Sequence, residues 1–260
     1  MRLRFLLLAM TVVLCSACEF KWIQGEPKSE DLRVSVLRYD RLESRYLTTG
    51  DFSALQQMNT QYPVETRTLL EDILKLGEVR DPSINARFLN FFQDTVLQTV
   101  IADAELQYAN MDDINETLSN AFVKLQEMIP GLSLPTVYAQ IGAFNQSIVV
   151  GDKMIGISLD KYLGQDYPAY EHYYNVHQRR TMLRSYIVPD CLTFYLLSLF
   201  PMKNFEASTQ AERDYHMGRV QWVVNKSLGR TFFHSSAVAA ADSLVKKKNL
   251  SAVQLLTVNK

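Results

Sequence analysis

The spacing of hydrophobic residues along the chain separates strand-like stretches from helical ones. Residues 33–40 alternate polar and apolar side chains, which predicts a strand with one buried face. Helical spacing predicts helices over 51–62, with Asp51 as the N-cap, over 84–101, and over 112–128. The apolar residues that define two of these faces are Phe52, Leu55 and Met58 in the first helix, and Ile114, Leu118, Ala121, Phe122, Leu125 and Met128 in the third.

The middle of the chain changes to short β-rich runs at 136–141, 147–150 and 154–160, separated by turn-forming residues. These runs predict a three-stranded antiparallel meander. After it, helical spacing returns until the end of the chain. The helices expected there cover 169–186, 189–200, 207–228 and 234–247. The pattern therefore predicts an α+β fold, a mostly helical single domain with a small antiparallel sheet.

The N-terminus has the features of a bacterial lipoprotein signal. Arg2 and Arg4 precede an apolar run over 5–14, and small residues stand before Cys18. A charged start, an apolar stretch too short to span a bilayer and a small-residue cleavage site are the parts of an export signal. We expect Cys18 to become the acylated N-terminus of the mature protein. An ordinary cleaved signal and an uncleaved anchor are the alternatives.

The predicted organisation is a signal peptide over 1–17, a tether over 18–31 and one globular domain over 32–260. Removing the signal changes the formal charge from −1 to −3, so there is no basic excess to attract nucleic acid. No later segment has the roughly 18 to 20 consecutive apolar residues of a membrane-spanning helix. We therefore expect attachment by lipid alone, to the inner or the outer membrane, with the domain facing the periplasm.

Residues that could carry catalysis do not form a known motif. The sequence has four histidines but no His-Glu-x-x-His pair of zinc ligands, and Cys191 lies among apolar neighbours that favour an inert thiol. We expect no metal, no cofactor and no enzymatic activity. The alternative is a divergent hydrolase in which the fold brings Asp190, Glu171 and His172 together.

The densest polar and aromatic segment covers residues 160–174. Tyrosines next to charged residues suit a contact surface, because each ring offers a large apolar face and a hydroxyl group. A loop that packs over the edge of the sheet with half-buried tyrosines is an equally weighted alternative. The residues predicted to form a partner surface are Asp160, Tyr162, Asp166, Tyr167 and Tyr170.

Several segments together resemble a known family. A β-rich run over 154–164 ends in Gly-Ile-Ser-Leu-Asp followed by Lys-Tyr-Leu-Gly, residues 38–42 read Arg-Tyr-Asp-Arg-Leu, and residues 187–190 read Ile-Val-Pro-Asp. With the lipoprotein signal, these segments resemble the gliding-motility lipoprotein family GldB of the Bacteroidota over most of residues 32–200. Residues 237–260 differ from the C-terminal end expected of that family.

The resemblance implies a fold similar to that of zincin metallopeptidases, without their zinc ligands. The helix at 189–194, which would correspond to the metal-binding helix, contains neither histidine nor glutamate. The resemblance therefore implies a lipid-anchored, non-catalytic component of an envelope complex associated with gliding motility and secretion, with envelope proteins as partners. A degenerate zinc-peptidase relative with hydrolase activity and a ligand-binding periplasmic lipoprotein are the alternatives.

Overall fold

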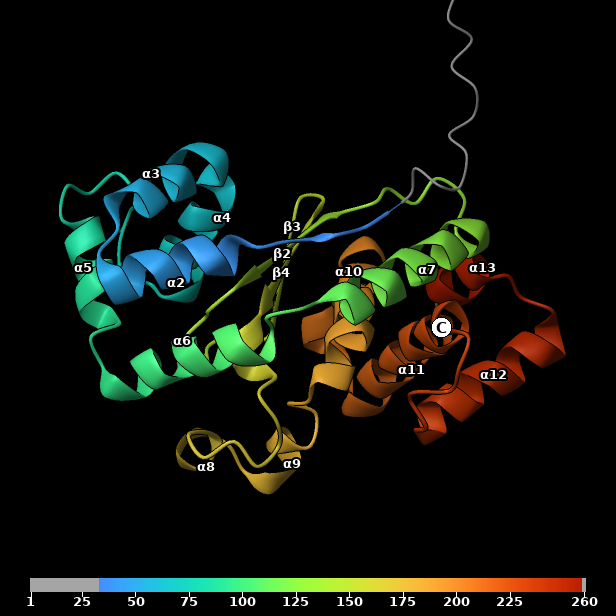
Figure 1. Cartoon of the computed structure of the whole chain (residues 1–260). Coiled ribbons are helices and arrows are strands. Elements are labelled where there is room, and N and C mark those ends of the chain that lie inside the picture. The colour runs from blue at the N-terminus through green and yellow to red at the C-terminus, as the bar shows by residue number, and fades with distance from the viewer. Residues whose placement is uncertain (1–32, 259–260) are drawn as a thin grey trace, which may run out of the picture. The chain divides into compact units, whose positions relative to one another are not determined.

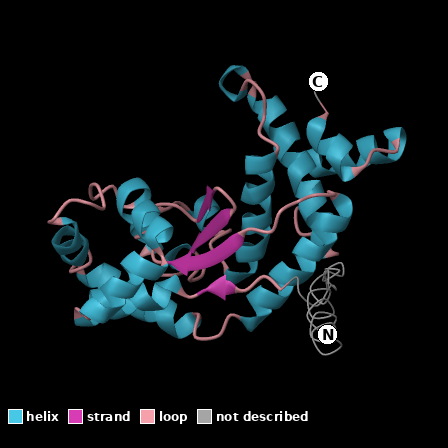
Figure 2. Cartoon of the chain, turned by 90° about the horizontal axis from the view of Figure 1, so that it is seen from above, coloured by secondary structure: helices cyan, strands magenta, loops and turns pink. Residues whose placement is uncertain are grey.

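The computed structural model describes residues 33–258, and the predicted signal peptide, Cys18 and the tether lie outside the described residues. The described residues cluster as one compact unit. Within it, a small four-stranded sheet lies between two groups of helices (Figures 1 and 2). This arrangement confirms the mostly helical α+β fold class. The zincin-like arrangement stays a prediction.

The sheet is mixed, and the predicted antiparallel meander is wrong. Its strands are β1 (Val36–Leu37), β2 (Thr136–Gln140), β3 (Ile148–Gly151) and β4 (Met154–Ser158), in the order β1-β2-β4-β3. β2 runs parallel to both β1 and β4, and only β3 and β4 form an antiparallel hairpin. Burial explains this order, because β2 and β4 are buried over four consecutive residues whereas β3 is only partly buried. A strand covered on both faces lies inside a sheet, and a half-exposed strand lies at its edge.

The first group of helices follows β1. It comprises α2 (Tyr39–Thr49), α3 (Phe52–Gln61), α4 (Pro63–Arg67), a π-helical turn (Thr68–Ile73), α5 (Ile84–Phe91) and α6 (Thr95–Gln107). The strand predicted over 33–40 is reduced to two residues, because α2 begins at Tyr39 and buries Tyr39, Glu43, Tyr46 and Leu47 at helical spacing. α2 packs against β2 and α6.

Two predicted helices of this group need correction in detail. Asp51 caps α3 as predicted and accepts a hydrogen bond from the backbone N–H of Ser53, but Phe52 is 77% exposed and does not belong to the buried face. The helix predicted over 84–101 is two helices. Asp94 divides them, because its side chain accepts from two backbone N–H groups in the first turn of α6.

The second group of helices contains α7 (Asp112–Met128), α10 (Ile187–Leu199), α11 (Gln210–Leu228), α12 (Ser236–Lys248) and α13 (Ala252–Thr257). α10 packs against β3 and β4 on one side and against α7 and α11 on the other. α7 buries five of the six apolar residues expected on its face. α13 was not predicted from the sequence.

The continuous helix predicted over 169–186 is wrong. The chain there forms two single-turn helices, α8 (Tyr170–Tyr173) and α9 (Val176–Arg179), and a 3-10 turn (Arg184–Tyr186). Tyr174 and Asn175 have extended backbones, and the Asn175 side chain caps α9. This capping box with Gln178 starts a new helix and prevents the first one from continuing.

Candidate interaction surface

The chain that leaves β4 is fixed to the end of the sheet by Asp160. The Asp160 carboxylate is fully buried and accepts hydrogen bonds from the backbone N–H groups of Gly142 (2.7 Å) and Phe144 (2.6 Å). In this turn, Ala143 and Phe144 have positive φ angles of 48° and 65°, which are unfavourable for residues with side chains. Burial raises the pKa of Asp160, although its hydrogen bonds act in the opposite direction. Asp160 therefore holds a strained turn next to the sheet.

A second buried carboxylate holds the same turn from α2. One oxygen of Glu43 accepts from the backbone N–H of Ile141 (2.8 Å), and its other oxygen has no hydrogen-bond partner among the described residues. Burial raises the pKa of Glu43 well above its usual range, and the nearby Asp160 and Asp40 raise it further. A raised pKa favours the neutral acid, which suits a carboxyl group without a cationic partner.

Tyr170 lies at the centre of the segment that follows Asp160. Its buried hydroxyl donates to the backbone carbonyl of Asp160 (2.5 Å) and accepts from the backbone N–H of Leu163 (2.9 Å). The rings around it have centroids at 5.1 Å (Tyr167), 5.7 Å (Phe144) and 5.8 Å (Tyr174), all edge to face. Tyr170 therefore joins α8 to the turn after β4 through both polar and aromatic contacts.

Tyr162 and Tyr167 join the same segment to two other helices. The Tyr162 hydroxyl donates to the Asp190 carboxylate on α10 (2.8 Å), and the ring is buried. The Tyr167 hydroxyl donates to the Asp103 carboxylate on α6 (2.8 Å), and its ring is half-buried. These contacts fix residues 159–170 against the body of the domain.

The predicted partner surface therefore needs correction. Asp160, Tyr162 and Tyr170 are buried and serve packing and hydrogen bonding, so they do not form an accessible surface. Asp166 is exposed and Tyr167 is half-buried, so only these two reach the surface. The alternative of a loop packed over the sheet edge describes the first three residues correctly. Partner binding at Asp166 and Tyr167 stays a prediction.

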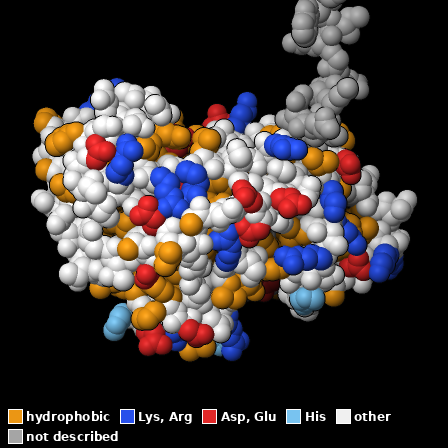
Figure 3. All heavy atoms as spheres, viewed as in Figure 1, with side chains coloured by type: hydrophobic (Ala, Val, Ile, Leu, Met, Phe, Trp, Pro, Cys, Tyr) orange, Lys and Arg blue, Asp and Glu red, His pale blue; other side chains and the backbone are white. Residues whose placement is uncertain are grey.

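The accessible apolar residues of this region come later in the chain. Tyr173 and Val176 are each 60% exposed, and the Tyr173 ring lies over the Phe144 ring at 5.3 Å. Charged and histidine side chains surround them on α8 and α9, where Glu171 forms an ion pair with Arg179 (3.1 Å). Figure 3 shows this mixture of hydrophobic, charged and histidine side chains at the bottom of the view. The sequence held one usable signal, the capping-box spacing of Asn175 and Gln178, which would have separated α9 from α8. We call these residues the α8–α9 surface: Tyr173 on α8, Val176 at the start of α9, and Asp166 and Tyr167 in the turn that precedes α8.

The groups proposed for catalysis are engaged in separate interactions. Asp190 accepts from Tyr162 and is surrounded by apolar α10, and burial raises its pKa to about 7. Glu171 and His172 are exposed on α8, where Glu171 pairs with Arg179. Among residues 33–258, no group of three or more His, Cys, Asp or Glu side chains could hold a metal ion.

Cys191 follows Asp190 and is fully buried. Burial raises the pKa of its thiol well above its usual range, and the Asp190 charge acts in the same direction. A thiol in that state is a poor nucleophile. The structure confirms the predicted buried cysteine.

A family model described as "Gliding motility protein GldB" matches residues 23–232. No curated protein and no solved structure matches the chain. The matched range contains the sheet, the α8–α9 surface and α11, and it ends before α12. In the described part of the chain, no helix is both long enough and apolar enough to cross a membrane.

Proposed function

The chain belongs to the gliding motility protein GldB family, and from this premise we propose that it is a lipid-anchored, non-catalytic component of a cell-envelope protein complex. The proposed anchor is the acylated Cys18, in the inner or the outer membrane, with the domain facing the periplasm. The family match and the signal-like N-terminal sequence support this location.

The use of the buried polar groups supports a role without catalysis. Asp160 and Glu43 bind backbone N–H groups of the turn after β2, and neither carboxylate reaches the surface. Carboxylates that accept these backbone hydrogen bonds stabilise the fold and are not accessible to a substrate. Their raised pKa values follow from burial, which perturbs structural carboxylates as it does catalytic ones.

The α8–α9 surface carries the proposal of a protein partner. Tyr173 and Val176 expose apolar area on a segment whose backbone is fixed by Asp160 and Tyr170. Protein interfaces favour aromatic anchors inside a polar rim, and an anchor held rigid before binding loses little conformational entropy. We therefore expect an envelope protein to bind over Tyr173 and Val176.

The test is crosslinking and mass spectrometry on intact cells. Cells would carry the wild type, Cys18→Ala, the double variant Tyr173→Ser with Val176→Ser, or the control Phe52→Ser. Phe52 is a suitable control because it is 77% exposed on α3, a different part of the domain. We expect the same specific partners with wild type and control, and their loss with Cys18→Ala and with the double variant. Unchanged partners in the double variant would refute the α8–α9 surface, and the absence of any partner in the wild type would refute the complex.

The alternative is a degenerate relative of zinc peptidases that retains hydrolase activity. It is favoured by one observation, the buried Asp190 on α10, whose pKa of about 7 would suit acid–base catalysis; that α10 corresponds to a metal-binding helix is only what the resemblance implies. Metal analysis of the purified protein separates the two proposals. A tightly bound transition metal in a 1:1 ratio would support the hydrolase, and a metal-free, stably folded protein would support the non-catalytic component.

A further inference from the structure

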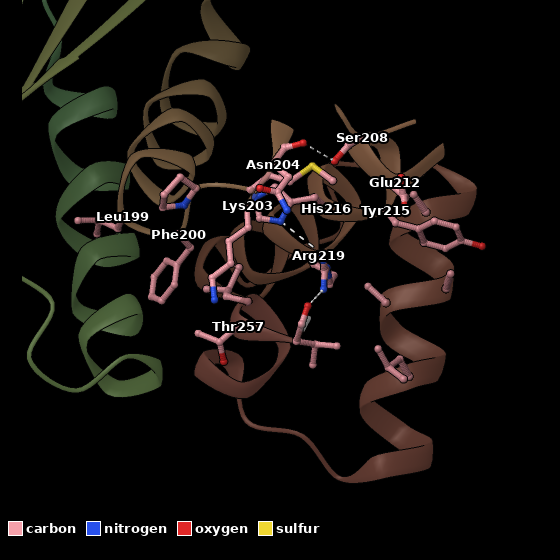
Figure 4. A pocket seen from close by; sticks show the side chains of 18 of the residues that line it. Leu199, Phe200, Lys203, Asn204, Ser208, Glu212, Tyr215, His216, Arg219 and Thr257 are labelled. Atoms are coloured by element: carbon pink, nitrogen blue, oxygen red, sulfur yellow. Dashed lines mark hydrogen bonds between the residues drawn. The ribbon is translucent and has the colours of Figure 1, made fainter. Parts of the chain in front are cut away.

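A pocket of about 940 Å³ lies among the last helices of the domain (Figure 4). One wall is the 199–208 segment after α10, and the others are α11, α12 and the end of α13. Its size is in the range that accommodates a small organic ligand, roughly 300–1,000 Å³. Most of its lining is apolar and includes Leu199, Ala240, Ala241, Leu244 and Leu256.

The pocket depends on a close crossing of α11 and α12. A Cβ atom at Gly218 would lie 2.5 Å from the backbone carbonyl carbon of Ala237, so only glycine allows this approach. Beyond the crossing, α12 presents Ala240, Ala241 and Leu244 to the pocket. Alanine side chains leave space where larger residues would fill it. The pocket therefore follows from the small residues on these two helices.

A guanidinium group lies in this apolar surrounding. The Nη1 atom of Arg219 donates to the backbone carbonyl of Val258 (2.5 Å), and Nη2 lies 3.5 Å from Nδ1 of His216. Within residues 33–258, Nε of Arg219 has no hydrogen-bond partner and the side chain forms no ion pair. Burial lowers the pKa of Arg219, which reflects the cost of removing its charge from water. An anion in the pocket would offset that cost.

His216, which lies beside Arg219, is a second polar side chain buried in the pocket lining. It is only 6% exposed. Its Nε2 atom has no partner of normal hydrogen-bond geometry among the described residues, although a hydrogen bond between the ring and the Phe200 backbone acts to raise the pKa of His216. Burial and the Arg219 charge lower the pKa of His216, so it contributes a polar N–H group more than a charge. Lys203, which is exposed, adds a second cation to the pocket lining. The lining also contains one acidic residue, Glu212, whose side chain accepts hydrogen bonds from Thr209 in the capping box of α11.

We propose that this pocket binds one amphiphilic carboxylate of the fatty-acid type. The carboxylate would pair with Arg219 and Lys203, and the alkyl chain would lie along Ala241, Leu244 and Leu256. Arginine binds carboxylates through charge-assisted hydrogen bonds, and these are strongest where water is excluded. The exposed apolar side chains Leu199 (42%) and Tyr215 (45%) line the pocket as well, and they offer an apolar path for an alkyl chain.

The pocket and the α8–α9 surface are separate sites on the domain. α12 and α13 lie outside the residues that the family model matches, and the pocket is built on different elements from the α8–α9 surface. A pocket that binds nothing would leave the proposed complex unaffected, and loss of partners from the α8–α9 surface would leave the pocket unaffected.

The test is a fluorescence titration of the purified full chain with dansyl-undecanoate, followed by displacement with oleate below its micellar concentration. We expect one site per chain. Oleate should displace the probe, whereas acetate, which lacks the tail, and oleyl alcohol, which lacks the charge, should displace it at least about tenfold less well.

Two variants and a control locate the site. Arg219→Gln should weaken probe binding by about 10- to 100-fold, the value of a charge-assisted hydrogen bond. Ala240→Phe fills the pocket without removing a charge and should abolish binding, which keeps the test decisive if Arg219→Gln fails to fold. Arg80→Gln, in an exposed turn before α5, should bind as the wild type does.

Three outcomes would overturn the proposal. The first is unchanged binding in both pocket variants. The second is displacement by oleyl alcohol as strong as by oleate. The third is stronger displacement by a short peptide with a free C-terminal leucine than by oleate, which would assign the pocket to a peptide terminus instead.

Discussion

Removing one hydroxyl group at Tyr170 tests whether the α8–α9 surface is rigidly attached to the sheet. In Tyr170→Phe the ring keeps its contacts with Phe144 and its other aromatic neighbours, but two hydrogen bonds disappear. One joins the hydroxyl to the backbone carbonyl of Asp160 and the other to the backbone N–H of Leu163. Both hydrogen bonds are buried, so no solvent replaces the missing hydroxyl unless the segment opens.

The expected cost follows from these two groups. A buried backbone donor or acceptor left without a partner costs about 1–3 kcal/mol, so two of them cost about 2–6 kcal/mol. Domains of this kind are stable by only about 5–15 kcal/mol, so the loss is easily measured. Tyr173→Phe is the matched control, three residues later in α8. Its ring also contacts Phe144 but is 60% exposed, so we expect a change below about 0.5 kcal/mol.

The assay is urea unfolding followed by circular dichroism, with hydrogen exchange to locate the change. We expect a lower midpoint for Tyr170→Phe at an unchanged slope, and faster exchange at the Leu163 amide. A free energy of unfolding for Tyr170→Phe equal to that of Tyr173→Phe would refute the reasoning. The α8–α9 surface would then not depend on Tyr170.

Three further predictions concern the helices behind the sheet. Gly218→Ala should destabilise the domain in urea unfolding, because overpacking against α12 costs about 1–3 kcal/mol and exceeds the roughly 1 kcal/mol gained in helix propensity. Adding Ala237→Gly removes the Ala237 Cβ at 2.6 Å but leaves the backbone carbonyl carbon at 2.5 Å and its oxygen at 2.7 Å, so it should not fully restore stability, and a full rescue would contradict this. Asp190 has a pKa of about 7 in the folded state and about 3.9 when unfolded, so the unfolded chain loses its proton first and the wild type loses stability as the pH rises from about 4 to about 7. Asp190→Asn should flatten that part of a thermal-unfolding profile, and an unchanged slope would show that Asp190 is not the cause. Cys191 should react with a thiol reagent far more slowly in the native protein than in urea, as peptide mapping would show, and comparable rates would contradict its burial.

The sequence predicted the long amphipathic helices well because periodicity and caps are local signals. The 112–128 helix has the predicted bounds, and Asp51 caps α3. The pattern does not predict α2, because three of its six buried positions are the polar residues Asp40, Glu43 and Ser44, and the strand predicted over 33–40 includes only its first two residues. The break at Asp94 was missed because apolar residues continue on both sides of the cap.

The order of the strands was beyond local reasoning. Short β-rich runs separated by turns are compatible with a meander, and nothing in their spacing shows that β4 pairs with β2 in parallel. The choice depends on which strands the helices cover, since α2 packs on β2 and α10 on β3 and β4. These contacts join residues far apart in the sequence, and they decide which strand lies at the edge.

The same long-range dependence explains why the predicted surface residues are buried. Charge and tyrosine content made the 160–174 segment look accessible, yet Asp160 is buried because it binds the N–H groups of a turn formed 16 to 18 residues earlier. Glu43 is buried for the same reason, through a hydrogen bond to Ile141 across 98 residues of sequence. Hydrogen bonds to the backbone offset the desolvation cost that normally keeps a polar residue at the surface. The partner proposed above is therefore expected to contact Tyr173 and Val176, which are each 60% exposed, and not the buried Asp160, Tyr162 and Tyr170.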